Sequence, residues 1–254
     1  MNTFFLDRLN SEPHALAFAG QSTPWPVALA DQSANPALDE GLHTHTAAAQ
    51  ALLYPVSAEL LATTGRPVDL FGFEPNPARL GAAAAASASV PGIALTQLGA
   101  LLDAAALGYN PAQAKPVAVL GHSQGVLAVH MVQAICEAGS IDAAAAKIDE
   151  ILAIATLIGV AGTRQARQLG LAARHGEATP MLSVKDITRA QVDALIERVD
   201  GARGPIAVAV TNSATHYVLS GYPEDLAAFG VEVAKEHKRQ AKLREGKVRG
   251  GRVF

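Results

Sequence analysis

The chain has 254 residues, half of them hydrophobic, and a formal net charge of −3. It is long enough to bury a sizeable core, either as one domain with an insertion or as two domains. The nearly balanced charge argues against nucleic acid as the main partner, because nucleic-acid-binding surfaces are strongly basic.

The single cysteine and the distribution of apolar residues indicate the cellular compartment of the protein. Cys136 has no second cysteine to pair with inside the chain, so an oxidising compartment is not needed. Residues 1–10 include Asp7 and Arg8 and lack the apolar stretch of a secretory signal. No run reaches the roughly 18 uninterrupted apolar residues of a membrane span. The sequence therefore predicts a cytoplasmic protein that has no membrane partner.

The first candidate strand is Ala15–Ala19, a short apolar run of the kind found in buried strands, and it leads into the loop Gly20–Pro24. Loops at the carboxyl ends of parallel strands form the ligand sites of doubly wound sheets. We therefore expect this loop to lie beside the site, where the Gln21 N–H can act as a hydrogen-bond donor. A plain strand-to-helix connection is the alternative.

Proline positions and apolar periodicity divide the next hundred residues. They predict loops at 22–40 and 65–79, and helices at 43–63 and 92–107, the second opened by Pro91. His43 and His45 would point to different sides of the first helix, and no third ligand is near. We therefore expect no metal site.

The pattern around which the chain is organised lies at 117–138. A strand-length apolar run, Val117–Leu120, is followed by Gly121-His122-Ser123-Gln124-Gly125 and then by a helix-length segment with apolar residues nearly all round. The first run is typical of a buried parallel strand, and the segment's lack of a polar face predicts a buried helix. A serine between two glycines on a strand-to-helix turn is the nucleophile elbow.

The chemistry of an elbow explains this spacing. The turn forces Ser123 into a strained backbone conformation and lifts its Oγ clear of the sheet, while a side chain at Gly121 or Gly125 would collide with the neighbouring strand or helix. The Gln124 N–H lies at the helix N-terminus, where it can stabilise an oxyanion. The alternative is an ordinary loop whose serine caps a helix. His122 would be aimed away from the serine by the tight turn, so we interpret it as a packing residue.

Another helix is predicted at 142–159, after the elbow helix. Three arginines follow it at 164, 167 and 174, which we interpret as solvated, with anion contact as the alternative. From about Gly176 the pattern changes to strand, helix, strand, strand, helix, the first helix opened by a capping box of Thr188 and Gln191. This is a ferredoxin-like order without its last strand. The basic tail from Lys235 to Arg252 is interpreted as a solvated helix end; contact with an acidic carrier or a phosphate is the alternative.

Together these motifs resemble the acyl-CoA:acyl-carrier-protein transacylases, and most closely the amino-terminal acetyltransferase region of bacterial type I fatty acid synthases. The resemblance covers nearly the whole chain. It rests on the stretches Phe18–Gln21, Ser89–Gly92, Gly121–Ala128, Leu157–Gly159 and Lys247–Gly251.

The resemblance implies an α/β fold with an α/β-hydrolase-like parallel sheet, helices on both of its faces, and an inserted ferredoxin-like α+β subdomain. The expected boundaries are 1–176 for the large subdomain, 177–246 for the small one and 247–254 for the start of a return segment.

The resemblance also implies an activity. Ser123 would take an acetyl or other short acyl group from coenzyme A and pass it to the phosphopantetheine thiol of an acyl carrier protein domain. Gln21 and Gln124 would be the oxyanion donors, and Gly20, His122 and Ile158 would line the substrate site. No tightly bound cofactor is expected, and the partners would be acyl-CoA, the carrier and the other domains of a fatty acid synthase.

Two departures from the family pattern matter. Ile158 stands where malonyl-specific relatives have an arginine, which favours a neutral acyl group. The family's general base is a histidine in a Phe-His-Ser/Thr-Pro context, which this sequence lacks. We therefore expect the base to lie beyond Phe254 and the isolated chain to be inactive. A serine hydrolase or thioesterase, and a non-catalytic fragment of the multienzyme, are the alternatives.

Overall fold

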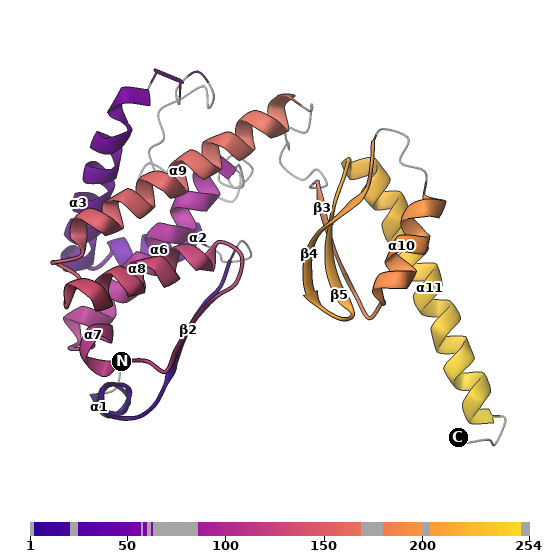
Figure 1. Ribbon diagram of the computed structural model, residues 1–254, viewed down its shortest axis with the longest axis horizontal. Coiled ribbons are helices and arrows are strands. Elements are labelled where there is room, and N and C mark those ends of the chain that lie inside the picture. Colours follow the sequence, from indigo (N-terminus) through magenta and orange to yellow (C-terminus); the bar gives the residue numbers. More distant parts are fainter. Residues whose placement is uncertain are drawn as a thin grey trace. The chain divides into compact units, whose positions relative to one another are not determined.

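A computed structural model describes residues 3–20, 25–56, 58–59, 62, 86–168, 180–199 and 204–249. The chain divides into two compact units, Met1–Leu169 and Gly170–Phe254, and Figure 1 shows the elements of each. Each unit has its own cluster of buried apolar side chains, and no residue belongs to both clusters. The chain is an α/β protein, as the sequence predicts.

The first unit is mainly helical around one parallel strand pair. Its helices are α1 (Thr3–Ser11), α2 (Trp25–Ser33), α3 (Pro36–Leu53), α6 (Ala86–Ala106), α7 (Pro111–Ala114), α8 (Gly125–Ala138) and α9 (Ala145–Gln168), with a 3₁₀ turn, η1 (Tyr54–Val56). The strands β1 (Ala15–Phe18) and β2 (Ala118–Gly121) pair from Ala15↔Ala118 to Phe18↔Gly121. Their carboxyl ends therefore meet at one edge.

Residues 25–33 and 36–53 are helical, so the prediction of a loop over 22–40 is wrong for the residues described, apart from the turn at 34–35. Asn35 caps α3, because its Oδ1 accepts a hydrogen bond from the Ala37 N–H at 3.2 Å, and Pro36 follows at the first helical position. Proline is favoured there, since the first turn of a helix has no partner for an N–H. The predicted helix 43–63 corresponds first to α3, which begins at Pro36 and ends at Leu53, and the described residues 58, 59 and 62 are helical as well. The predicted loop 65–79 lies outside the described residues.

Helix α6 is the centre of the first core. It begins at Ala86 rather than after Pro91, so this proline lies inside it. The Ser87 N–H at its amino end donates to Thr163 Oγ1 of α9 at 2.9 Å. Among the described helices α6 is long and apolar enough to cross a membrane, but 72% of that apolar window is buried inside the structure. Packing in the core accounts for its composition.

Helices α6 and α9 approach closely at a glycine. A Cβ on Gly159 would collide with the carbonyl oxygen of Ala86 and lie 3.0 Å from the Ser87 Cα. Helix α9 runs through the predicted end at Gly159 to Gln168 (Figure 1). Between α9 and α3, His45 Nδ1 and Asp149 Oδ1 form a largely buried pair at 2.6 Å. The small residues around 159 thus serve helix packing rather than a turn.

The prediction that the strand pair is buried on both faces is wrong for the described residues. Leu16, Phe18 and Val119 pack against the core, whereas Leu120 is 59% exposed on the other face. Helix α8 is likewise buried on one side only, because Val126 and Cys136 are exposed. An all-apolar sequence permits a helix to be buried on all sides, but the elements packed against the helix determine how much of its surface is buried.

The second unit has the predicted strand-helix-strand-strand-helix order. It consists of β3 (Met181–Lys185), α10 (Arg189–Arg198), β4 (Ala207–Ser213), β5 (His216–Ser220) and α11 (Pro223–Arg249), and the antiparallel sheet has the order β3-β5-β4. Leu182, Val184, Tyr217 and Leu219 belong to the same apolar cluster as side chains of α10 and α11. The basic tail described to Arg249 is the end of α11.

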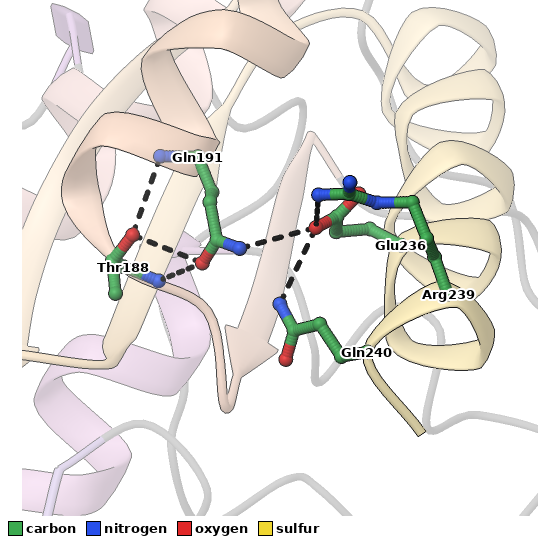
Figure 2. A network of polar contacts seen from close by, with 5 residues as sticks. All are labelled: Thr188, Gln191, Glu236, Arg239 and Gln240. Carbon is green, nitrogen blue, oxygen red and sulfur yellow. Dashed lines mark hydrogen bonds and ion pairs between the residues drawn. The ribbon is translucent and has the colours of Figure 1, made fainter. Parts of the chain in front are cut away.

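The capping box of α10 also ties that helix to α11 (Figure 2). Gln191 Oε1 accepts from the Thr188 N–H at 2.9 Å, which closes the box. The same side chain donates through Nε2 to Glu236 Oε1 at 3.1 Å, and Arg239 donates to Glu236 at 2.7 and 2.9 Å. The Arg239 hydrogen bonds lower the pKa of the Glu236 carboxyl below its ordinary value.

Candidate active site

Ser123 occupies the turn between β2 and α8 with a φ of +54°. L-residues rarely adopt this left-handed region, and the strain it stores persists only where the surrounding structure enforces it. The Ser123 side chain is exposed. The turn therefore has both properties predicted for a nucleophile elbow, a strained backbone and a hydroxyl that a substrate can reach.

The two flanking glycines enforce this turn. A Cβ on Gly121 would lie 2.6 Å from the Gly125 carbonyl and the Val126 nitrogen, and one on Gly125 would collide with the Phe18 carbonyl of β1. Both obstacles are backbone, which cannot move aside without moving the helix or the strand. The predicted steric role of Gly121 and Gly125 is confirmed.

The carboxyl end of β1 lies directly against the elbow. A Cβ on Gly20 would be 2.7 Å from both the His122 carbonyl oxygen and the Ser123 Cβ, and 3.3 Å from the Gln124 nitrogen. The His122 N–H donates to the Phe18 carbonyl at 3.0 Å. The loop that begins at Gly20 thus starts beside Ser123, as the sequence predicts.

Of the two predicted oxyanion donors, Gln124 lies among the described residues and Gln21 does not. Gln124 precedes the first residue of α8, where the positive end of the helix dipole favours a developing negative charge. Its side-chain Oε1 is buried and has no hydrogen-bond partner among the described residues. Gln21 lies outside the described residues, so its role stays a prediction.

His122 and Ile158 are the other predicted site residues. His122 is exposed, so the interpretation of it as a packing residue is wrong; the elbow carries it past the end of the strand pair. Ile158 is 51% exposed on α9, which contacts α8. The first unit thus holds Gly20, Ser123, Gln124 and Ile158 in adjoining elements.

Several histidines form hydrogen bonds to groups other than Ser123. His14 bonds the Tyr109 hydroxyl at 2.8 Å, His45 bonds Asp149, and His237 bonds the Lys185 carbonyl at 3.0 Å. His216 bonds Ser183 Oγ at 2.9 Å in the second unit. Within the described ranges, no group of three or more His, Cys, Asp or Glu side chains is placed to hold a metal ion.

Sequence reasoning missed one residue at this site, Gln97 of α6. Its Nε2 donates to the Ala19 carbonyl at 2.5 Å, immediately before Gly20. The signal was a lone amide side chain in the middle of an apolar helix, which needs a partner wherever it is buried.

Residues 180–254 match the family model described as the fatty acid synthase central AT domain. Over 128 residues, or 45% of this chain, the sequence is 30% identical to the fatty acid synthase beta subunit hexB of Dothistroma septosporum. The chain spans 7% of the length of that relative.

Solved structures share the fold. The malonyl CoA-acyl carrier protein transacylase of Coxiella burnetii matches with a TM-score of 0.54 and 19% identity, over 89% of this chain and 58% of that one. A malonyl-transacylase in complex with its type II PKS acyl-carrier protein matches with a TM-score of 0.51 and 15% identity, over 89% of this chain and 60% of that one.

The fold is that of the acyl-carrier-protein transacylases, with a nucleophile-elbow geometry at Ser123. Within that class, the family model and the curated relative support an acyltransferase region of a fatty acid synthase.

Proposed function

We propose that this chain carries the acyl-transfer site of a fatty acid synthase and that Ser123 is its nucleophile. The Ser123 Oγ would attack the carbonyl carbon of an acyl-CoA thioester, with Gln124 and Gln21 N–H groups stabilising the oxyanion. The C–S bond would break with return of the proton to the coenzyme A sulfur. A carrier thiol would then attack the carbonyl carbon of the seryl ester, forming a new C–S bond. The acyl C–Oγ bond would break, and the proton of the thiol would pass to Oγ.

One observation carries this proposal. Ser123 combines a φ of +54° with the close approach of Gly20, so a strained serine lies between two chain segments that can each offer an N–H group. A serine that only capped α8 would adopt the extended backbone typical of capping residues and would need no such approach. The names of the relatives, a fatty acid synthase subunit and a malonyl-transacylase bound to its carrier, support this reaction class.

We propose that the acyl group is short and neutral, as an acetyl group is. Ile158 offers no charge to a malonyl carboxylate, and Arg164, the next arginine along α9, is paired with Glu59 at 2.8 Å. Neither side chain would give a malonyl carboxylate the charge-assisted hydrogen bond that would favour it over a neutral acyl group. The acyl donor would be acetyl-CoA, with no tightly bound cofactor.

The general base is proposed to be a histidine outside the described residues. A serine hydroxyl needs a neighbour to accept its proton, and such help is worth about 10²–10⁴ in rate. The hydrogen bonds of His14, His45, His216 and His237 direct a ring nitrogen of each to another group. We also propose a cytoplasmic location, where an exposed thiol such as that of Cys136 stays reduced.

A comparison of acceptors tests the proposal against hydrolysis, which needs the same elbow. The full-length protein is given radiolabelled acetyl-CoA with or without a phosphopantetheine-bearing carrier protein, and acetyl-carrier and free acetate are measured. We expect label on the carrier, its loss in Ser123→Ala, and its retention in Cys136→Ala, the matched change at an exposed thiol. Release of acetate at the same rate with and without the carrier would identify a hydrolase.

A further inference from the structure

Gln97 is a buried amide in the apolar core of the first unit. Its side chain is 8% exposed, and its neighbours on α6 include Ile93, Leu95 and Leu98, which are almost completely buried. A polar group in such surroundings destabilises the fold unless each of its polar atoms finds a hydrogen-bond partner. The presence of glutamine here therefore asks for an explanation.

A gain in stability does not explain this glutamine, because only one of the two polar atoms of its amide has a hydrogen-bond partner among the described residues. Gln97 Nε2 donates to the Ala19 carbonyl, whereas Oε1 is buried without a hydrogen-bond partner among the described residues. An unpaired buried acceptor destabilises the folded chain, and a leucine of similar size would avoid that loss.

The hydrogen bond that Gln97 does make controls one peptide plane. The Ala19 carbonyl and the Gly20 N–H belong to the same planar peptide unit, so fixing one fixes the other. Gly20 lies against the Ser123 Cβ. From this peptide unit the chain continues into Gln21, the proposed oxyanion donor, which lies outside the described residues.

We infer that Gln97 is a positioning residue for Ala19 and Gly20, the residues with which the oxyanion loop begins. It holds the Ala19 carbonyl and thereby keeps Gly20 against Ser123, at the point where the chain enters the oxyanion loop. This inference rests on the proposed acyl transfer. Gln97 touches neither the substrate nor Ser123 and acts through the backbone of the loop.

Gln32 provides a matched control. Its Nε2 donates to the Thr96 carbonyl of the same helix α6 at 2.9 Å, and its Oε1 is also buried and unpartnered among the residues described. Its hydrogen bond reaches a helix carbonyl instead of the oxyanion loop. Gln32→Leu thus removes the same kind of half-satisfied amide without touching residues 19–21.

The first measurement is the rate of Ser123 acylation at saturating and limiting acetyl-CoA in the full-length protein. Misplacement of a catalytic group by about 1 Å costs up to about 10²-fold in rate. We expect Gln97→Leu to lower kcat about 10- to 100-fold with KM nearly unchanged, and Gln32→Leu to leave both close to the unmodified values. Equal rates for the two variants would overturn the inference.

The pH dependence of the acylation rate provides a second test, because a purely structural role of Gln97 would not change it. In Gln97→Glu an ionised carboxylate cannot donate to the Ala19 carbonyl, but a protonated one can, and burial raises the pKa of a carboxyl group. The acylation rate of Gln97→Glu relative to the unmodified protein should therefore rise as pH falls. A ratio that stays constant with pH would count against a donated hydrogen bond.

Amide hydrogen exchange separates failure of this inference from failure of the proposed function. We expect faster exchange at Ala19, Gly20 and Gln21 in Gln97→Leu and no change there in Gln32→Leu. If the unmodified protein is not acylated at all, the proposed function fails, and exchange alone still decides whether Gln97 holds the loop. Unchanged exchange in Gln97→Leu would refute the positioning role.

Discussion

At the scale of single residues, the site depends on glycines at positions where a side chain would collide with neighbouring backbone. Ser123 adopts a conformation that costs an L-residue roughly 1–2 kcal/mol. Gly20, Gly121 and Gly125 allow three backbone segments to meet around it, because a Cβ on any of them would contact another backbone atom closer than 3 Å. The strain at Ser123 is thus maintained by its neighbours.

Gly20→Ala tests this arrangement. The new Cβ would lie 2.7 Å from the His122 carbonyl and the Ser123 Cβ, so we expect a loss of about 1–3 kcal/mol in the free energy of unfolding and an acylation rate reduced by about tenfold or more. In the control Gly230→Ala on α11, the new Cβ would meet a Leu182 methyl group at an ordinary contact distance of 3.9 Å. Denaturant unfolding should show a gain there of about 0.5–1 kcal/mol. Normal acylation by Gly20→Ala would mean that the contact with Ser123 is not maintained in solution.

Ile158→Arg tests the proposed acyl specificity. A charge-assisted hydrogen bond to a malonyl carboxylate is worth about 1.5–3 kcal/mol, or roughly ten- to a hundredfold in affinity. We expect the ratio of kcat/KM for malonyl-CoA to that for acetyl-CoA to rise by about this factor. The neutral polar control Ile158→Gln should change the ratio much less. If the unmodified protein uses both thioesters equally well, Ile158 does not determine specificity.

At the scale of elements, close helix packing and side-chain caps place the site. Helix α6 connects the β1 end, through Gln97, with α9, through the contact of Ala86 with Gly159. Helix α9 carries Ile158, next to that glycine in the sequence. The spacing between α6 and α9 therefore sets the position of the predicted specificity residue.

Gly159→Ala should disturb that spacing, since its Cβ would collide with the Ala86 carbonyl oxygen. We expect a loss of about 1–3 kcal/mol by denaturant unfolding, typical of overpacking. Gly162→Ala, one turn later on α9, meets only the Ala86 methyl group at 3.3 Å. It should change stability by less than about 1 kcal/mol. Equal effects at the two glycines would contradict close helix packing at Gly159.

Glu236 predicts a pH dependence for the second unit. Its pKa is lowered by Arg239, so the ionised form stabilises the fold above the unfolded-state pKa of about 4.3, and that contribution is lost as pH falls through the lower folded-state pKa. Glu236→Gln should cost about 0.5–1 kcal/mol at pH 7, because Arg239 is exposed. The difference should shrink as pH falls below about 4.3. Glu232→Gln, which removes an exposed pair with Lys235, is the control. A Glu236→Gln difference that persists at pH 2 would argue against this ion pair as its source.

At the scale of the whole molecule, local rules in the sequence predicted much of what was found. The elbow followed from the steric requirements of Gly121 and Gly125, and the strand-helix order of the second unit from periodicity and the capping box at Thr188. Helix α2 and the start of α3 were missed because proline breaks helix interiors but also begins helices, as Pro36 does. Gln97 was missed because its partner lies 78 positions away, a separation that no local pattern encodes.

The most direct test of the account is to find where the acyl group resides. The full-length protein is mixed with acetyl-CoA, quenched in acid within one turnover and digested, and the modified peptide is located by mass spectrometry. The account predicts an acetyl ester on Ser123, its absence in Ser123→Ala, and its presence in the matched exposed-serine control Ser11→Ala. An acyl group on any other residue, or full acetyl transfer by Ser123→Ala, would contradict it.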